Sequence, residues 1–261
     1  MPQADAKVLT VIPARLESSR LARKLLLRET GKSLLQHTWE NACRATRPIE
    51  TIVAVDHPLL AEECRRFGAP CVMTSPDCQS GTDRLAEVAA NRPEADVFVN
   101  VQGDEPELDP RTIDQVVERL LASPDAAIAT IASPIREESM LHDPAVVKAV
   151  CNSAGEALYF SRSWIPRMRD WSPEILSSAS TEGGDPPFLH HLGLYAYRRD
   201  FLLEFATLAP APIERLEKLE QLRALWHGRK IVVGVTQKAT PGIDTAADYQ
   251  AFVQRQRTAV L

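Results

Sequence analysis

Short runs of β-branched residues alternate with longer segments of helical periodicity through the first hundred residues. The strand-like runs each end in a polar loop, and we predict core strands at 7–12, 51–55 and 97–101. Apolar side chains recur at helical spacing between these runs, which predicts helices within 34–42, 59–67 and 85–90. Because alternating strands and helices form βαβ units, we expect an α/β fold: a mainly parallel sheet with helices on both faces.

The second half of the chain departs from this alternation. Two extended runs, 146–150 and 157–160, flank the segment Asn152-Ser153-Ala154-Gly155-Glu156, which predicts a β-hairpin. Prolines, serines and the pair Gly183-Gly184 interrupt 161–188, where we expect a long surface excursion. The remaining expected elements are strands at 127–132, 192–197 and 231–235, an amphipathic helix at 214–227 and a closing helix at 246–255.

The composition favours a folded protein that binds a small molecule. A chain of 261 residues with 44% hydrophobic residues can bury a full core, and we expect one domain over 1–261, with 146–195 as an excursion within it. The net charge of -5 argues against a nucleic-acid partner. No apolar run is long enough for a membrane span and no signal peptide is recognisable, so we expect no membrane contact and a cytoplasmic location. Five cysteines without a Cys-x-x-Cys pair are expected to be reduced thiols.

Two charged loops carry the main information about function, and each follows a predicted strand. The first, residues 13–24, is basic, and the second, Gln102-Gly103-Asp104-Glu105-Pro106, is acidic. In an open parallel sheet, ligands bind at the carboxyl ends of the strands, so loops of opposite charge there can hold a polyphosphate and its metal ion. This arrangement predicts a nucleotide-using enzyme.

The basic loop has the residue types that bind phosphate, although a solvated basic turn is the alternative. Its cationic residues are Arg15, Arg20, Arg23 and Lys24. Arginine binds phosphate oxygens through two N–H groups, and lysine acts as a point charge. Gly31-Lys32-Ser33 resembles the end of a P-loop, but Leu26 stands where that motif needs a glycine, so we expect a turn that opens a helix. No Gly-x-Gly-x-x-Gly follows the first strand, and NAD is therefore not expected.

The acidic loop predicts a magnesium site, with an ordinary acidic turn as the alternative. Mg²⁺ prefers one or two carboxylates together with substrate phosphates, and Asp104 should emerge at the ligand edge of the sheet. Asp244 is the best second carboxylate because it follows a strand and precedes a helix. An aspartate at that position can equally cap the helix, and both roles stay open.

A further polar segment, Ser80-Gly81-Thr82-Asp83-Arg84, leads into a helix whose free N-terminal amides suit an anion. Thr82 or Asp83 can cap this helix while Ser80 and Gly81 meet a ligand, and a simple capped helix start is the alternative. Other polar residues are isolated in the sequence, and each by itself is more often structural: Arg162, His191 and Glu220-Gln221.

Taken together, these segments resemble one family, the 3-deoxy-manno-octulosonate cytidylyltransferases, over nearly the whole chain. The matching motifs of the first half are Ile12-Pro13-Ala14-Arg15 with Ser19-Arg20-Leu21 and Lys24, Gln79-Ser80-Gly81-Thr82-Asp83-Arg84-Leu85-Ala86-Glu87, and Asn100-Val101-Gln102-Gly103-Asp104-Glu105-Pro106. Those of the second half are Ala157-Leu158-Tyr159-Phe160-Ser161-Arg162, His191-Leu192-Gly193-Leu194-Tyr195, Leu219-Glu220-Gln221-Leu222-Arg223 with Leu225-Trp226, and Gly242-Ile243-Asp244-Thr245. So many matches in the same order argue against chance.

The resemblance implies a Rossmann-like nucleotidyltransferase fold and a reaction of CTP with 3-deoxy-D-manno-octulosonate (Kdo) that gives CMP-Kdo and pyrophosphate, with Mg²⁺ as cofactor. It also implies a cytoplasmic homodimer that serves lipopolysaccharide synthesis. The segment 146–195 is the candidate dimer arm and is also expected to help bind the sugar. The implied CTP-binding residues are Pro13, Ala14, Arg15, Arg20, Lys24, Ser80, Gly81, Arg84 and Gln102. The implied sugar-binding residues are Gln102, Arg162, His191, Tyr195, Glu220 and Gln221. Asp104 and Asp244 are the implied metal ligands and, with Lys24, the implied catalytic residues.

One loop departs from the family pattern. Where the family usually has Arg-Leu-Pro-Gly-Lys-Pro-Leu, this chain has Arg20-Leu21-Ala22-Arg23-Lys24-Leu25-Leu26. If the usual glycine has a positive φ, Arg23 is strained at that position. We then expect the loop to close differently or to bind CTP less tightly.

Three rival functions stay open at this point. A cytidylyltransferase for sialic acid or an amino-substituted Kdo would differ only in its contacts with the sugar. A glycosyltransferase would usually carry an Asp-x-Asp metal motif, which this sequence lacks. A nucleotide-binding regulatory protein would bind CTP without turnover.

Overall fold

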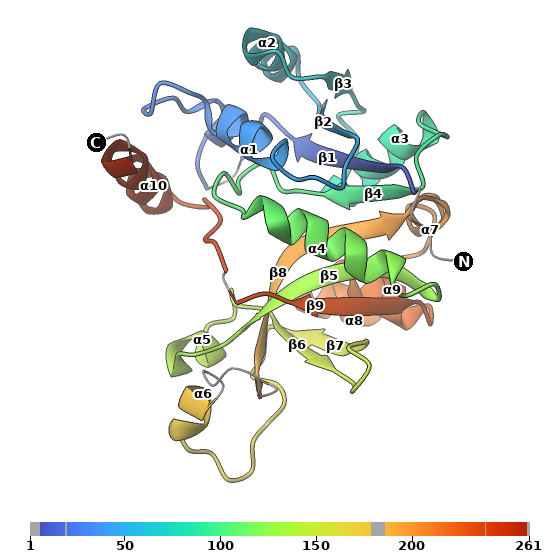
Figure 1. The fold of residues 1–261 in the computed structure, drawn as a ribbon, viewed down its shortest axis with the longest axis vertical. Coiled ribbons are helices and arrows are strands. Elements are labelled where there is room, and N and C mark those ends of the chain that lie inside the picture. Colours follow the sequence, from blue (N-terminus) through green and yellow to red (C-terminus); the bar gives the residue numbers. More distant parts are fainter. Residues whose placement is uncertain (1–5, 19, 179–185, 238, 260–261) are drawn as a thin grey trace.

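One mixed β-sheet runs through the computed structural model, which describes residues 6–18, 20–178, 186–237 and 239–259 (Figure 1). Its described strands are β1 (Val8–Ala14), β2 (Glu50–Val55), β3 (Cys71–Met73), β4 (Val97–Asn100), β5 (Ala126–Pro134), β6 (Lys148–Cys151), β7 (Ala157–Ser161), β8 (Leu189–Arg198) and β9 (Lys230–Val235). The main path runs β3-β2-β1-β4-β8-β5-β9, and β6 joins β7 to β8. Along the main path the neighbours are parallel, except that β8 is antiparallel to both β4 and β5.

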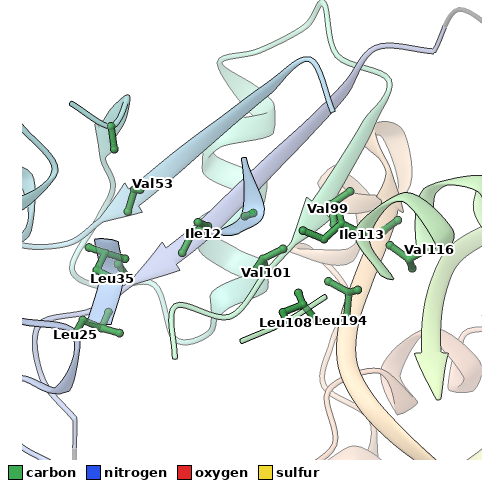
Figure 2. Close-up of a cluster of buried hydrophobic side chains, with 14 of the residues drawn as sticks. Ile12, Leu25, Leu35, Val53, Val99, Val101, Leu108, Ile113, Val116 and Leu194 are labelled. Carbon is green, nitrogen blue, oxygen red and sulfur yellow. The ribbon is translucent and has the colours of Figure 1, made fainter. Parts of the chain in front are cut away.

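Helices cover both faces of this sheet, as the sequence predicts. They are α1 (Leu34–Ala42), α2 (Pro58–Phe67), α3 (Gly81–Ala90), α4 (Pro110–Leu121), α5 (Glu138–His142), α6 (Glu174–Ser178), α7 (Arg199–Phe205), α8 (Pro212–Glu217), α9 (Leu222–Trp226) and α10 (Ala246–Ala259), with a short 3-10 helix, η1, at Lys24–Leu26. The first core joins Ile12 to side chains of α1, α2, α4 and α10, including Leu35 and Ile113 (Figure 2). The second core joins Val11 to side chains of α3, α7 and α9, including Leu85. Neighbouring β1 residues enter different cores because strand side chains alternate between faces.

The strands expected from the sequence are present, with ends that differ by at most three residues. The predicted hairpin is confirmed, since β6 and β7 are antiparallel and Ala149 lies opposite Phe160. Several described elements were not predicted: the short edge strand β3, the 3-10 helix η1 and the helices α4, α5, α6 and α7. The start of α4 did carry a signal, because Asp109 caps the helix and Pro110 occupies its first turn.

The single helix predicted over 214–227 is wrong, because the chain breaks there into α8 and α9. Lys218 adopts a left-handed conformation, with φ of 55°, and ends α8. Nine residues of a continuous helix would rise about 13.5 Å, which would separate Glu214 from Arg223. In the folded chain Arg223 Nη2 lies 2.6 Å from Glu214 Oε1, and both residues are buried. The break therefore allows a buried ion pair and places Glu220 and Gln221 in the turn between the two helices.

The expected surface excursion over 161–188 has a small core of its own. Residues 179–185, which include Gly183-Gly184, lie outside the described residues. In the described part, Leu176 of α6 and Phe188 are buried with Ile135 and Leu141, and Trp164 packs against them. This segment is therefore packed against the end of β5 and against α5, although apart from α6 its described part has little regular secondary structure.

Candidate active site

A cavity of about 340 Å³ lies where the loops after β1 and β4 meet, a size suited to a small-molecule ligand. It brings together ten residues that the sequence singles out: Pro13, Arg15, Arg20, Lys24, Ser80, Gly81, Arg84, Gln102, Asp104 and Asp244. Ala14, which the resemblance also places near the nucleotide, is fully buried in the first core. The structure thus confirms that the basic and acidic loops share one edge of the sheet.

Lys24 joins the two loops at the floor of the cavity. Its Nζ donates to Asp104 Oδ2 at 2.6 Å and to the Ile243 carbonyl oxygen at 2.6 Å, and it lies 3.4 Å from Asp244 Oδ1. Only 8% of the Lys24 side chain is exposed. Arg20 Nη2 also donates to Asp244 Oδ1, at 2.8 Å. Two cations and two carboxylates therefore converge at one point.

The backbone at Arg23 determines where Lys24 points. Arg23 has φ of 49° and ψ of 36°, the left-handed conformation that favours glycine, and it immediately precedes η1. Leu25 of η1 is buried beside Gly103, where an added Cβ would lie 3.3 Å from Leu25 Cδ1 and 3.2 Å from the Pro13 carbonyl oxygen. This conformation favours glycine and the residue is an arginine, so the strain expected at Arg23 is present.

Replacing Arg23 by glycine is expected to relieve this strain. Left-handed backbone costs a non-glycine residue about 1–2 kcal/mol, which exceeds the entropy cost of introducing glycine. Ala22→Gly is the matched control, because the neighbouring residue has no positive φ and gains only the entropy cost. In thermal unfolding, Arg23→Gly should melt about 3 °C above Ala22→Gly. An equal or lower midpoint for Arg23→Gly would contradict the strain.

Asp244 does not cap α10. Of the two roles left open for this residue, helix capping is therefore removed and metal binding remains. The Asp248 carboxylate accepts hydrogen bonds from the backbone N–H of Asp244, at 3.1 Å, and of Thr245, at 2.8 Å. The Thr245 hydroxyl in turn accepts from the Asp248 N–H, at 3.2 Å. The Asp244 carboxylate is therefore available for Lys24 and Arg20.

The donor set at this point fits a magnesium ion bound together with phosphate. Asp104 and Asp244 reach a single ammonium group from two different loops, and one or two carboxylates are what Mg²⁺ takes from a protein beside substrate oxygens. Burial, with the charges of Asp104 and Asp244, raises the pKa of the neighbouring Glu105 to about 8. The described residues contain no group of three or more His, Cys, Asp and Glu side chains placed to hold a metal.

The start of α3 forms the opposite wall of the cavity. Ser80, rather than Thr82 or Asp83, is the N-cap: its hydroxyl accepts from the Asp83 N–H at 3.1 Å, and the Asp83 carboxylate accepts from the Ser80 N–H at 3.1 Å. This reciprocal pair is a capping box. A Cβ on Gly81 would lie 3.2 Å from Pro13 Cγ, so glycine permits this close approach of α3 to β1.

Arg84 lines the cavity but is already paired. Its side chain is 5% exposed and lies 3.4 Å from Asp56 Oδ2. Asp56 also accepts from the Leu16 N–H, at 2.9 Å, and so holds the first residues of the basic loop. Asp56 was not among the residues expected from the sequence, although it follows β2 as Asp104 follows β4 and the same reasoning applies to it.

The expected sugar-binding residues other than Gln102 lie outside this cavity, and three of them border the second core. Tyr195 on β8 lies opposite Asn100 of β4, and the His191 ring packs against Tyr195 with centroids 5.3 Å apart. Glu220 Oε2 accepts from the Thr82 hydroxyl at 2.6 Å, which brings the α8–α9 turn to the start of α3. Burial raises the pKa of Glu220. These residues therefore lie on the α3 side of the sheet.

Arg162 is placed differently from the other expected sugar ligands. Its guanidinium donates to the carbonyl oxygens of Glu217, at 2.7 Å, and of Pro144, at 2.9 Å. Its backbone N–H donates to the Glu217 carboxylate at 3.0 Å. These contacts tie β7 to the end of α8, and like the other expected sugar ligands apart from Gln102, Arg162 does not line the nucleotide cavity.

Comparison with known proteins agrees with this architecture. Residues 9–231 match the family model described as cytidylyltransferase. The 3-deoxy-manno-octulosonate cytidylyltransferase of Rhodopirellula baltica is 50% identical over 249 residues, which cover 95% of this chain and 98% of that protein. The protein of the same name from Halorhodospira halophila is 46% identical over 248 residues, which cover 94% of this chain and 95% of that one.

A solved structure is also similar to this chain over nearly its whole length. It is a CMP:2-keto-3-deoxy-manno-octonic acid synthetase in complex with CTP, 36% identical to this chain. The two superpose with a TM-score of 0.88, and the match covers 97% of this chain and 100% of that one. The chain thus belongs to the cytidylyltransferase family and, within it, to the 3-deoxy-manno-octulosonate cytidylyltransferases, which are nucleotidyltransferase enzymes.

Proposed function

We propose that this enzyme transfers the CMP group of CTP to Kdo, releasing pyrophosphate and supplying CMP-Kdo for lipopolysaccharide synthesis. The observation that carries this proposal is the convergence of Arg20 and Lys24 with Asp104 and Asp244 in one cavity. A site of this kind suits a nucleoside triphosphate with its divalent cation. The similarity to relatives that carry this name, over nearly the whole of both chains, supports the substrate pair.

On the nucleotide side, the chain's own cations would bind the triphosphate. Arg15, Arg20 and Lys24 face the cavity and can bind phosphate oxygens, which neutralises the charge that develops on departing pyrophosphate. Asp104 and Asp244 would hold Mg²⁺, which would supply further charge neutralisation at the phosphates. Gln102, Ser80 and Gly81 would hold the rest of the nucleotide.

On the sugar side, buried polar groups near the second core would position Kdo. Gln221 is 4% exposed, and its Nε2 has no hydrogen-bond partner among the described residues, so it can donate to a substrate oxygen. His191, Tyr195 and Glu220 would complete the site, and Arg162 stays a predicted sugar ligand.

The reaction itself needs no nucleophile from the protein. The anomeric hydroxyl of Kdo would attack the α-phosphorus of CTP and lose its proton to water. The bond from the α-phosphorus to the oxygen shared with the β-phosphate would break, and that oxygen would leave with pyrophosphate. Phosphoryl-type transfer depends mainly on positioning and charge stabilisation.

The first test is pyrophosphate release from CTP and Mg²⁺ with Kdo, beside parallel reactions with sialic acid and with no sugar. We expect release that requires Kdo and that stops when EDTA removes the divalent ion. Release only with another sugar acid would keep the chemistry and change the substrate. CTP binding without release in any reaction would favour the regulatory alternative and contradict the proposal.

The magnesium requirement, the homodimer and the cytoplasmic location stay predictions of the resemblance. Among the described residues, every helix is too short or too polar to span a lipid bilayer. The dimer arm expected over 146–195 includes residues outside the described part of the chain.

A further inference from the structure

A buried hydrogen-bond relay determines which nitrogen of His191 carries its proton. The Thr130 hydroxyl donates its single proton to the Leu194 carbonyl oxygen, at 2.7 Å, since a carbonyl can only accept. The same hydroxyl oxygen lies 2.9 Å from His191 Nε2. Because its proton is already used, Thr130 Oγ1 must accept there, and His191 Nε2 must be the donor.

The remaining ring nitrogen of His191 is then left with a lone pair. His191 is 6% exposed, and burial lowers its pKa to about 3, so the ring is neutral at physiological pH. A neutral imidazole has one N–H, and with that proton on Nε2 the Nδ1 atom is a hydrogen-bond acceptor. The ring is fixed by edge contact with Phe160, at 4.9 Å between centroids, and by Tyr195, at 5.3 Å.

An irregularity in the sheet brings these groups together. Thr130 and Ala132 of β5 are two positions apart, but their partners on β8, Tyr195 and His191, are four apart. Gly193, with φ of 71°, lies in the extra length of β8. A bulge of this kind redirects side chains, and here it places the His191 ring beside both Thr130 and Tyr195.

A short series of contacts connects His191 to the nucleotide cavity. Tyr195, which packs against His191, is in register with Asn100. Asn100 Oδ1 accepts from Gln102 Nε2 at 3.3 Å, and Gln102 lines the cavity. A ligand extending from the cavity toward the second core would therefore approach the Tyr195 and His191 rings.

We infer that Thr130 is a positioning residue for sugar binding: it holds His191 in the Nε2–H form, so that Nδ1 accepts a hydrogen bond from a sugar hydroxyl. The inference rests on the proposed function for the identity of the ligand. A lone pair on Nδ1 repels a carboxylate, so His191 selects a hydroxyl donor and does not bind the acid group of the sugar. Thr130 was not among the residues expected from the sequence, because nothing in β5 distinguishes it from an ordinary strand threonine.

The relay is tested first on the wild-type protein without substrate. In ¹⁵N-labelled protein, the two ring nitrogens of a neutral histidine give distinct chemical shifts for the protonated and the bare nitrogen. The His191 signals are assigned by their loss in His191→Gln. We expect a protonated Nε2 and a bare Nδ1, and a protonated Nδ1 would overturn the inference.

Kinetics of two Thr130 variants then test the role in binding. Thr130→Val removes the hydroxyl at nearly constant volume, and we expect the KM for Kdo to rise about tenfold while the KM for CTP and kcat change less than twofold. The ring-nitrogen signals of His191 should shift toward a mixture of the two neutral forms. Thr130→Ser keeps the hydroxyl and should restore both the KM for Kdo and the signals.

The outcomes separate this inference from the proposed function. An unchanged KM for Kdo in Thr130→Val, or an equal rise of both KM values with unchanged ring signals, would overturn the positioning role. If the wild-type enzyme releases no pyrophosphate with Kdo, the proposed function fails, and the spectrum of the free protein still decides the state of His191.

Discussion

Asp104→Asn is expected to lower kcat for pyrophosphate release by on the order of 10³-fold while the protein stays folded. The carboxylate lies 2.6 Å from Lys24 Nζ and shares that cation with Asp244. An amide has nearly the same shape but no charge, so it would weaken both the position of Lys24 and the binding of a divalent ion. Lys24 keeps the Ile243 carbonyl and Asp244 as partners, so unfolding should change little.

The measurement compares kcat, the affinity for CTP and the thermal midpoint of Asp104→Asn with those of Glu107→Gln. Glu107 is a carboxylate three positions further along the same loop, but it pairs with Arg255, away from the cavity. The same change from acid to amide there should leave kcat within about twofold, since an exposed ion pair contributes little. A fully active, Mg²⁺-dependent Asp104→Asn enzyme would rule out the role of Asp104 in metal binding.

The meeting of the basic and acidic loops could be predicted because strand ends are visible in the sequence. Parallel strands present their carboxyl ends at one edge, so Arg15 and Asp104 had to lie on the same side. The contacts of Lys24 could not be predicted from residue types alone. They depend on the left-handed backbone at Arg23, which an arginine does not indicate and which only the family's glycine at this position suggested.

The break between α8 and α9 at Lys218 could not be predicted from the sequence either. Both α8 and α9 keep apolar residues at helical spacing, so periodicity alone reads them as one helix. What separates them is a tertiary contact, the burial of Glu214 against Arg223, which no local pattern records. The position of Glu220 beside Thr82 follows from that break.

Sugar-side residues were the least predictable part of the site. They come from separate strands and from a turn, so no single segment shows that they belong together. Arg162 is an example, because only the family motif places it near the sugar acid, and its side-chain hydrogen bonds to the Glu217 and Pro144 carbonyl oxygens were not foreseeable.

Removing one partner of the buried Glu214–Arg223 ion pair, which joins α8 to α9, is expected to have the largest effect on stability. Arg223 donates two hydrogen bonds to the Glu214 carboxylate, at 2.6 and 3.0 Å, and the carboxylate also accepts from the Ala211 N–H, at 2.9 Å. Arg223→Met would leave a buried carboxylate without its cation, which costs about 3–5 kcal/mol. The thermal midpoint should fall by about 6–20 °C.

The matched control is Arg255→Met, which also breaks a two-point arginine–carboxylate contact, but at an exposed position where 45% of the arginine side chain is accessible. Its loss should cost less than about 1 kcal/mol. Adding Glu214→Leu to Arg223→Met removes the buried carboxylate that has lost its cation, and the double variant should recover most of the stability. If both single variants melt alike, the Glu214–Arg223 pair does not hold the turn. If they differ as expected, the same pair that breaks the predicted helix also keeps Glu220 beside the start of α3, and stability and substrate binding depend on one contact.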